Sequence, residues 1–397
     1  MTIESASPRP TLRQRVSLYP GQFIGAMVMV SLGPLLDPLM RDLDVPLSRG
    51  GVISALFFVG GVLGILVVNC VMAKVSVTRT IVTGMALQGV GLVAGSTAQD
   101  LWTLLPALFV AGLGGVFVNT ICWIWLPAHV KENMAAAALL MISFFALGMI
   151  VTPVVLGIVM DAGATWRWIL VAEGGVSLLA ASFFAVFPLL DVTGRQNIRP
   201  QQLSRVVNHN RGLLLAIVVA IFMYTGAETS FNVWLPKFQI DVFGASDAWA
   251  SLSVTLFWIG IIAGRLIMVP LTKRFSPSRL LLVCAAILAV MAVGVALAPT
   301  LATSMIFSVG AGLGASAAYG LIGSYAGHFP GWYSGVVSSL FVLGGSFGCA
   351  LFPYIFGPLA SAGGFRFALA AVALPALAFG ALSFLIHSRS QEREPSG

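Results

Sequence analysis

The second half of this chain repeats the first half with a constant shift of 200 residues. Leu56-Phe57 returns as Leu256-Phe257, and Ala111-Gly112-Leu113-Gly114 returns as Ala311-Gly312-Leu313-Gly314. Several glycines, a proline and two loop residues are also kept at this shift: Gly60/Gly260, Gly64/Gly264, Ser76/Ser276, Arg79/Arg279, Gly148/Gly348, Pro153/Pro353 and Gly157/Gly357. Because glycine and proline control helix contact and kinking, the repeat predicts two copies of one backbone.

The composition identifies lipid as the main solvent of these two copies. Hydrophobic residues make up 58% of the chain and charged residues only 9%, whereas soluble domains carry about 25% charged residues. Successive apolar runs are long enough to cross roughly 30 Å of hydrocarbon. There are twelve: residues 17–40, 50–72, 79–98, 102–128, 135–160, 167–190, 212–239, 248–271, 279–298, 301–327, 333–359 and 364–387. Their continuity argues against the alternating strands of a membrane β-barrel, so we expect an all-α membrane protein.

Polar segments divide the chain. Residues 1–16 lack the apolar core and cleavage site of a signal peptide, so we expect a retained cytoplasmic tail. Residues 191–211 carry four arginines and are expected to link an N-terminal six-helix bundle (17–190) to a C-terminal one (212–387). Residues 388–397 would form a second cytoplasmic tail.

The basic residues predict the orientation. With both termini in the cytoplasm, 15 of the 21 Lys and Arg fall in cytoplasmic segments and five in outer loops, which fits the positive-inside rule. The net charge of +7 therefore reflects topology and lipid headgroups, and nucleic-acid binding is not expected. We predict a multi-pass protein of the cell (inner) membrane, a monomer in contact with membrane lipid.

No sequence motif indicates an enzyme or an ATP-driven pump. No lysine follows a glycine, so the phosphate-binding loop G-x-x-x-x-G-K-[ST] is absent, and there is no H-E-x-x-H motif or His/Cys cluster. We therefore expect no cofactor, no metal and no catalytic residue. Energy for any transport would come from an ion or solute gradient.

Glu228 is the foremost functional candidate, since a charged group at the bilayer centre costs about 2.5–3.5 kcal/mol. It lies near the middle of span seven, with Tyr224 and Asn232 four residues before and after it, so all three share one helix face. A carboxyl there could exchange protons as its surroundings change. The alternative is a structural carboxyl hydrogen-bonded to a neighbouring helix.

Two further pairs of charges lie near the ends of spans. Asp37 and Lys237 are related by the 200-residue shift, and a salt bridge between them could close an outer gate; alternatively, each reaches water separately. Glu173 in span six lies close to Arg167. For that residue we expect an intrahelical or snorkelling contact.

Several amides and aromatic rings fall within the spans. Asn119 and Trp123 are four residues apart in span four, and this combination suits a neutral sugar or polyol, although packing between helices is an alternative role. The predicted substrate-binding residues are Gln22, Asn119, Trp123, Tyr224, Glu228, Asn232, Trp258 and Tyr319. The predicted coupling or gating residues are Glu228, Asp37 and Lys237.

The repeated six spans, with basic loops after spans two and eight, resemble the major facilitator superfamily over nearly the whole chain. The loop motif of that family is represented here by Lys74, Arg79, Arg265, Lys273, Arg274 and Arg279. Both loop copies lack the family's aspartate and carry serine, Ser76 or Ser276, in place of its second glycine. The resemblance implies that Arg265 is a helix-end charge in contact with the neighbouring loop.

The loop pattern L-x-K-[RK]-x-S, with Ser276 at its end, is similar to the fucose-permease-like sugar branch of that superfamily. So are residues 224–228, followed by Trp234, and residues 257–260. The resemblance implies inward movement of a neutral sugar together with protons. The branch has coupling carboxylates in spans one and four; span four has none here, so Glu228 would take over that role.

We therefore expect a secondary transporter that moves a small polar solute, a sugar or a similar neutral metabolite, by proton symport and alternating access, with spans one, four, seven and ten lining the cavity. A competing hypothesis is an exporter of amphipathic compounds. Span five keeps Pro153 and Gly157 of the exporter motif G-P-x-x-G-G but has neither of two further glycines. Uptake of an organic anion, and solute binding by a receptor that does not transport, are two more hypotheses.

Overall fold

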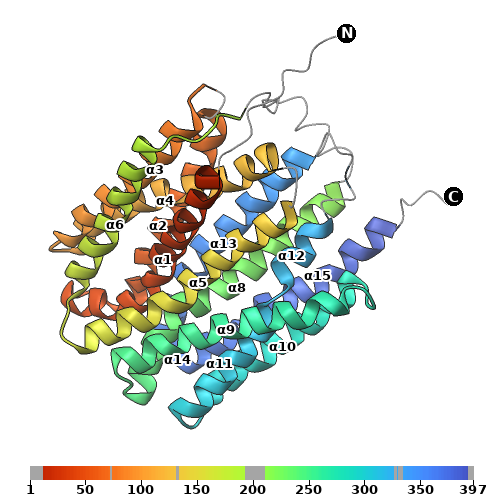
Figure 1. Cartoon of the computed structure of the whole chain (residues 1–397). Helices are drawn as coiled ribbons and strands as arrows, with labels where there is room; N and C mark the ends of the chain where they lie inside the picture. The colour runs from red at the N-terminus through yellow and green to blue at the C-terminus, as the bar shows by residue number, and fades with distance from the viewer. Residues whose placement is uncertain are drawn as a thin grey trace.

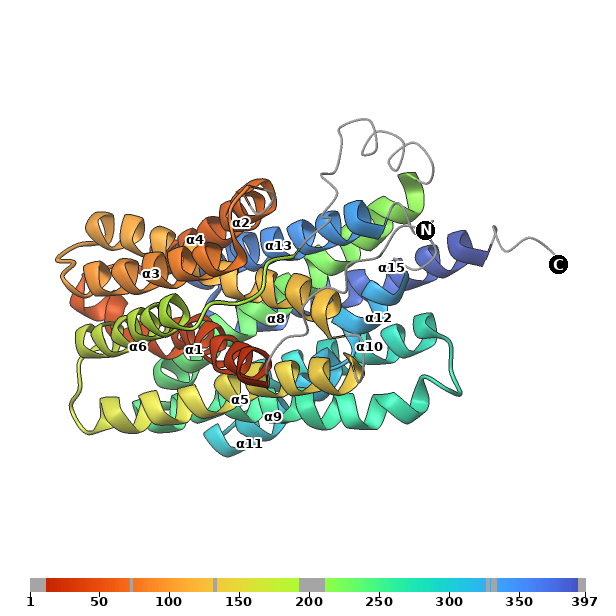
Figure 2. The ribbon, with the colours of Figure 1, turned by 45° about the horizontal axis from the view of Figure 1, so that its top comes forward.

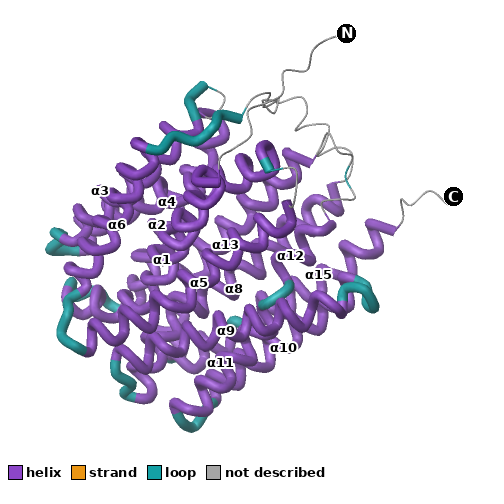
Figure 3. The backbone as a smooth tube through the Cα atoms, in the orientation of Figure 1, coloured by secondary structure: helices purple, strands orange, loops and turns teal. Residues whose placement is uncertain are grey.

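The computed structural model describes residues 12–71, 74–130, 134–192, 211–325, 329 and 334–391. Within these residues all regular secondary structure is helical (Figure 3). Twelve segments of the described chain are long and apolar enough to cross a membrane. The predicted all-α fold is confirmed, whereas both predicted tails and the linker lie largely outside the described residues.

The helices of the first half form one span each. They are α1 (Leu12–Asp42), α2 (Leu47–Val71), α3 (Val77–Ser96), α4 (Leu101–His129), α5 (Met134–Asp161) and α6 (Trp166–Val186).

The second half follows the same order, with two interruptions that the sequence did not predict. Spans seven to nine are α8 (Arg211–Phe243), α9 (Asp247–Leu271) and α10 (Pro277–Leu297). Span ten is broken into α11 (Leu301–Ala315) and α12 (Ala318–Ser324), span eleven is α13 (Ser334–Gly363), and span twelve is divided into α14 (Phe365–Ala371) and α15 (Ala373–Gln391).

The helices form two bundles that lie side by side (Figure 1). In the first, α4 packs on α2 and α3, and α3 also packs on α6; in the second, α10 packs on α11 and α15. The bundles meet through α2 with α13, α5 with α9, and α1 with α8. The start of α1 and the end of α15 lie at the same end of the helices (Figure 2). We call that end the terminus side and the opposite end, where α1 connects to α2, the far side.

Corresponding helices of the two bundles begin with the same local interactions. Asp100 caps α4 in a capping box with Thr103, and Thr300 caps α11 in a capping box with Thr303. Each box satisfies backbone groups that the first turn would otherwise leave without partners. The 200-residue repeat is therefore kept in helix capping although Asp100 and Thr300 differ in type.

The repeated glycines are contact points between helices. A Cβ atom added to Gly112 in α4 would collide with the carbonyl of Phe57 in α2, and one added to Gly312 in α11 would collide with the carbonyl of Phe257 in α9. Small residues let two membrane helices approach until their backbones touch. The repeat thus preserves the same helix crossing in both bundles.

These crossings lead to a stability prediction. Gly112→Ala and Gly312→Ala should each lower stability by about 1–3 kcal/mol, because the added methyl forces two backbones apart. The measurement is the apparent melting temperature of the purified protein in detergent. Gly175→Ala in α6 is the control, since a Cβ there meets nothing within 4 Å. Equal melting temperatures for all three variants would contradict this packing.

Candidate functional site

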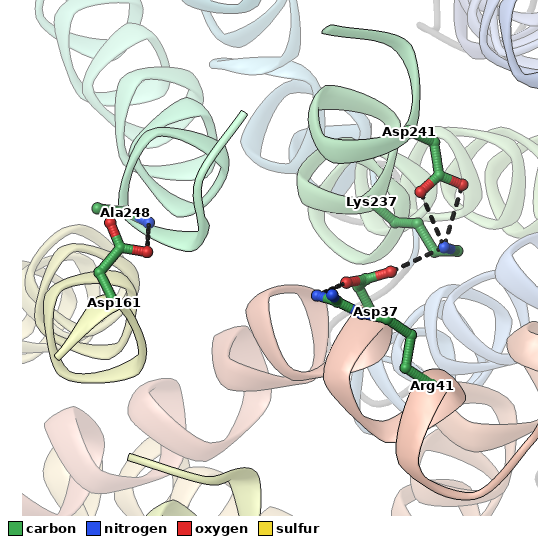
Figure 4. Close-up of polar contacts among 6 residues, drawn as sticks. All are labelled: Asp37, Arg41, Asp161, Lys237, Asp241 and Ala248. Atoms are coloured by element: carbon green, nitrogen blue, oxygen red, sulfur yellow. Dashed lines mark hydrogen bonds and ion pairs between the residues drawn. The ribbon is translucent and has the colours of Figure 1, made fainter. Parts of the chain in front are cut away.

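The two bundles contact each other closely towards the far side. A Cβ atom on Gly33 of α1 would collide with the backbone carbonyl of Asn232 in α8. At the end of α5, Asp161 accepts a hydrogen bond from Ser246 Oγ at 2.8 Å and one from the backbone N–H of Ala248 at 3.3 Å, and Figure 4 shows the Ala248 contact. The halves are thus joined by backbone contacts and hydrogen bonds at this end.

A buried ion pair joins the same ends of α1 and α8 (Figure 4). Lys237 Nζ donates to Asp37 Oδ1 at 2.8 Å and to Asp241 Oδ1 at 3.0 Å, and Arg41 pairs with Asp37 Oδ2. Asp37 is only 2% exposed. Of the two alternatives left open for Asp37 and Lys237, the structure therefore shows the salt bridge and not two charges that reach water separately.

Glu228 lies near the middle of α8 and is half-buried. Its carboxyl lies beside the Tyr224 hydroxyl and within electrostatic range of the Arg265 guanidinium from α9. Tyr319 of α12 and Cys349 of α13 are also electrostatic neighbours of Glu228. Four helices of the C-terminal bundle thus contribute polar groups around one carboxyl.

Two of these neighbours also bind the break in span ten. The buried Tyr224 hydroxyl donates to the carbonyl of Ala315 at 3.0 Å, and Arg265 Nε donates to the carbonyl of Ser316 at 3.1 Å. Arg265 lies inside α9, six residues before its end at Leu271. It therefore donates to a helix break within the bundle, whereas the resemblance had implied a contact with the neighbouring loop.

Asn232 and Trp258 bind each other. Trp258 Nε1 donates to Asn232 Oδ1 at 2.7 Å, and both side chains are buried. The Trp258 ring also lies edge-on to Phe145 of α5, with ring centroids 6.4 Å apart. The amide of Asn232 and the indole of Trp258, both predicted to contact substrate, are thus hydrogen-bonded to each other at the boundary between the bundles.

The remaining predicted binding residues are placed differently from one another. Asn119 and Trp123 lie on α4 and both side chains are exposed, that of Trp123 to 46%. Tyr319 is 44% exposed, and its ring makes an edge-on contact with the ring of Phe341. Gln22 of α1 is instead buried beside Cys122 of α4, and its amide nitrogen has no hydrogen-bond partner among the described residues.

The expectation for Glu173 was wrong. Arg167 pairs with Asp42 at the end of α1, while Glu173 is only 5% exposed and accepts a hydrogen bond from Ser31 Oγ at 3.1 Å. Gly174, the next residue, packs against Gly89 of α3. This glycine is the sequence feature that could have indicated a buried helix contact at this part of α6.

The basic residues of the loop motif lie on the terminus side. Lys74, Lys273 and Arg274 follow α2 and α9, whereas Arg79 and Arg279 lie in the first turns of α3 and α10; all are exposed. Cys70 near the end of α2 is exposed as well.

One segment matches the nucleophile pattern G-x-S-x-G, residues 344–348, but it lies within the helix α13. Its serine, Ser346, donates to the carbonyl of Val342 at 2.9 Å. A nucleophile elbow requires a sharp turn between a strand and a helix. The match is therefore a helix segment without that geometry.

The model of the Major Facilitator Superfamily matches residues 18–348. The chain belongs to the Major Facilitator Superfamily. The glucose/mannose transporter GlcP of Bacillus subtilis (strain 168) is 23% identical over 346 residues, 84% of this chain and 85% of that protein. The chain is accordingly a membrane transporter with sugar transporters among its relatives.

Solved structures share the fold. A bacterial homologue of the human lysosomal transporter Spinster, inward-facing and unoccupied, superposes with a TM-score of 0.81 at 13% identity, covering 97% of this chain and 98% of that one. FucP in the outward conformation gives 0.65 at 19% identity, covering 95% and 99%. The twelve-helix fold with two six-helix bundles is thus confirmed.

The buried ion pair predicts a specific loss of stability. Asp37→Asn should destabilise the protein by about 3–5 kcal/mol, because Lys237 and Arg41 then keep their charges with a buried partner removed. Asp42→Asn is the matched control: its pair with Arg167 is about half-exposed and should contribute about 1 kcal/mol or less. Melting temperatures in detergent compare the two variants, and an equal loss would show that the Asp37 pair is not held in a buried environment.

Proposed function

We propose that this transporter moves a small neutral polar solute, a sugar or a similar metabolite, together with protons by alternating access. The proposal rests on the position of Glu228, which lies in the middle of α8 beside Tyr224 of the same helix and Arg265 of α9. The relationship to a glucose/mannose transporter supports the choice of a sugar. The excess of basic residues on the terminus side supports an orientation in the cell (inner) membrane with both termini cytoplasmic.

The solute would contact polar side chains around Glu228. A polar group in the middle of a span costs free energy if it faces lipid. The exposed side chains of Asn119, Trp123 and Tyr319 are therefore assigned to the solute path between the bundles. An amide and aromatic rings offer hydrogen bonds to hydroxyl groups and apolar surface to a sugar ring. Asn232 and Trp258, which bind each other, would adjust to the solute.

The Asp37–Lys237 pair would act as the far-side gate. It joins α1 to α8, one helix from each bundle, and the far side is closed while it persists. Opening that side requires the pair to separate, and each charge then needs water or another partner. Lys237 keeps Asp241 and Asp37 keeps Arg41 on their own helices, so both charges retain a local partner when the bundles move apart.

Glu228 would couple this movement to protons. Protonation removes one negative charge beside Arg265, so the central site differs by a full charge between the two forms. A solute that binds one form more tightly shifts the protonation equilibrium by the same factor. Such reciprocal linkage is what symport requires.

Arg265 favours a second candidate, uptake of an organic anion. The guanidinium was expected at a helix end, yet it lies within electrostatic range of Glu228. With Glu228 protonated, the site would carry a net positive charge that suits a carboxylate. Counterflow with labelled neutral hexoses and labelled carboxylates separates the two: exchange of a hexose supports the sugar, and exchange of carboxylates alone supports the anion.

The coupling role of Glu228 is tested by uptake into vesicles with and without an imposed pH gradient. Glu228→Gln should retain counterflow but lose accumulation driven by the gradient, because the amide cannot bind and release a proton. Asp100→Asn, at the exposed start of α4, is a control carboxyl that should keep accumulation. Wild-type accumulation and proton dependence in Glu228→Gln would rule out the proposed role.

A further inference from the structure

The break in span ten is held by side chains from two other helices. Residues 316 and 317 form a turn between α11 and α12, and neither is a proline. Tyr224 of α8 donates to the Ala315 carbonyl and Arg265 of α9 donates to the Ser316 carbonyl. A broken helix within the membrane requires such partners for its backbone groups.

The neighbouring helices approach the break closely. A Cβ atom on Gly264 of α9 would collide with the side chain of Ser316, and one on Gly314 would collide with the backbone of Leu288 in α10. The break is therefore confined between α9 and α10. Small movements of Tyr224 or Arg265 would therefore shift the backbone at the break.

Both donors at the break are neighbours of Glu228. A tyrosine hydroxyl has one proton to donate, so Tyr224 can serve the Ala315 carbonyl or a carboxylate, but not both. A protonated Glu228 can instead donate to the Tyr224 oxygen and leave the bond to Ala315 in place. An ionised Glu228 competes for Tyr224 and Arg265, and hydrogen bonds to a carboxylate are about twice as strong as neutral ones.

We propose that Tyr224 and Arg265 form a latch that holds the break of span ten while Glu228 is protonated and releases it when Glu228 ionises. This inference rests on the proposed function, in which Glu228 binds the transported proton. The two residues act as positioning residues for α12, which carries Tyr319. Release of the latch would let the terminus-side segment of span ten move relative to the rest of its own bundle.

Within the described part of the chain, the ionisable neighbours of Glu228 supply no cation besides Arg265. The neighbours on the helices packed against α8 are Arg265 on α9, Tyr319 on α12 and Cys349 on α13, and Cys284 on α10 lies near Tyr224. Among these neighbours Arg265 alone is permanently charged. The charge that responds to ionisation of Glu228 is therefore the one that binds the break.

A distance within one bundle tests the latch without interference from rocking of the halves. Spin labels are placed at Ser324→Cys on α12 and at Leu297→Cys on the far end of α10, both exposed, in a full-length background with Cys70, Cys122, Cys284 and Cys349 replaced by alanine that retains counterflow. Pulsed electron paramagnetic resonance gives the distance distribution in acidic and alkaline buffer.

The latch predicts a distance that shifts with pH in the parent protein. Glu228→Gln should show the acidic distribution in both buffers, while Tyr224→Phe and Arg265→Gln should show the alkaline distribution in both. Tyr354→Phe, which alters an exposed tyrosine on α13, is the matched control and should keep the shift. A parent distance that does not change with pH, or a Glu228→Gln variant that still shifts, overturns the latch.

Transport assays on the same samples separate this inference from the proposed function. If Glu228→Gln loses gradient-driven accumulation while the α12 distance stays fixed in the parent protein, Glu228 couples protons and the latch is wrong. If Tyr224→Phe keeps counterflow but accumulates solute only to simple equilibration, and its distance is fixed in the alkaline form, the latch is supported. Full accumulation by Tyr224→Phe contradicts it.

Discussion

A charge can remain inside a hydrocarbon slab only while an opposite charge or strong hydrogen-bonding partner is held beside it. Asp37 meets this condition through Lys237 of the other bundle and Arg41 of its own helix. The arrangement makes the far-side contact between the bundles depend on electrostatics as well as packing. Because each charge also has a partner on its own helix, the bridge between the bundles can break without leaving either charge unpaired.

The helix α8 connects this bridge to the middle of the membrane. Lys237 and Glu228 are nine residues apart on it, about 14 Å along the axis at 1.5 Å per residue. Between them lies Asn232, bound to Trp258 and packed through its backbone against Gly33 of α1. A shift of α8 therefore acts at once on the far-side ion pair, on the contact with α1 and on the surroundings of Glu228. Alternating access by this chain would use that one helix to link the gate to the coupling carboxyl.

Features set by local sequence could be predicted, and features set by contacts between distant helices mostly could not. The apolar runs predicted the twelve spans, and the 200-residue repeat predicted the two bundles. The repeat also related Asp37 to Lys237, but it left open whether they form a salt bridge or reach water separately. The break at Ser316 contains no proline from which it could be predicted. Its backbone carbonyls, those of Ala315 and Ser316, accept hydrogen bonds from Tyr224 and Arg265, which are distant in sequence. Glu173 failed for the same reason: its partner Ser31 is 142 residues away, whereas Arg167 is close only in sequence.

The central claim is that solute and proton cross together through Glu228. It is tested most directly in proteoliposomes that hold a pH-sensitive dye and start with equal pH on both sides. If the claim is correct, a gradient of the transported sugar drives proton movement in the same direction in the wild-type protein, and Glu228→Gln abolishes the dye response while sugar still equilibrates. Sugar entry without any dye response in the wild-type protein, or an unchanged response in Glu228→Gln, would contradict the account.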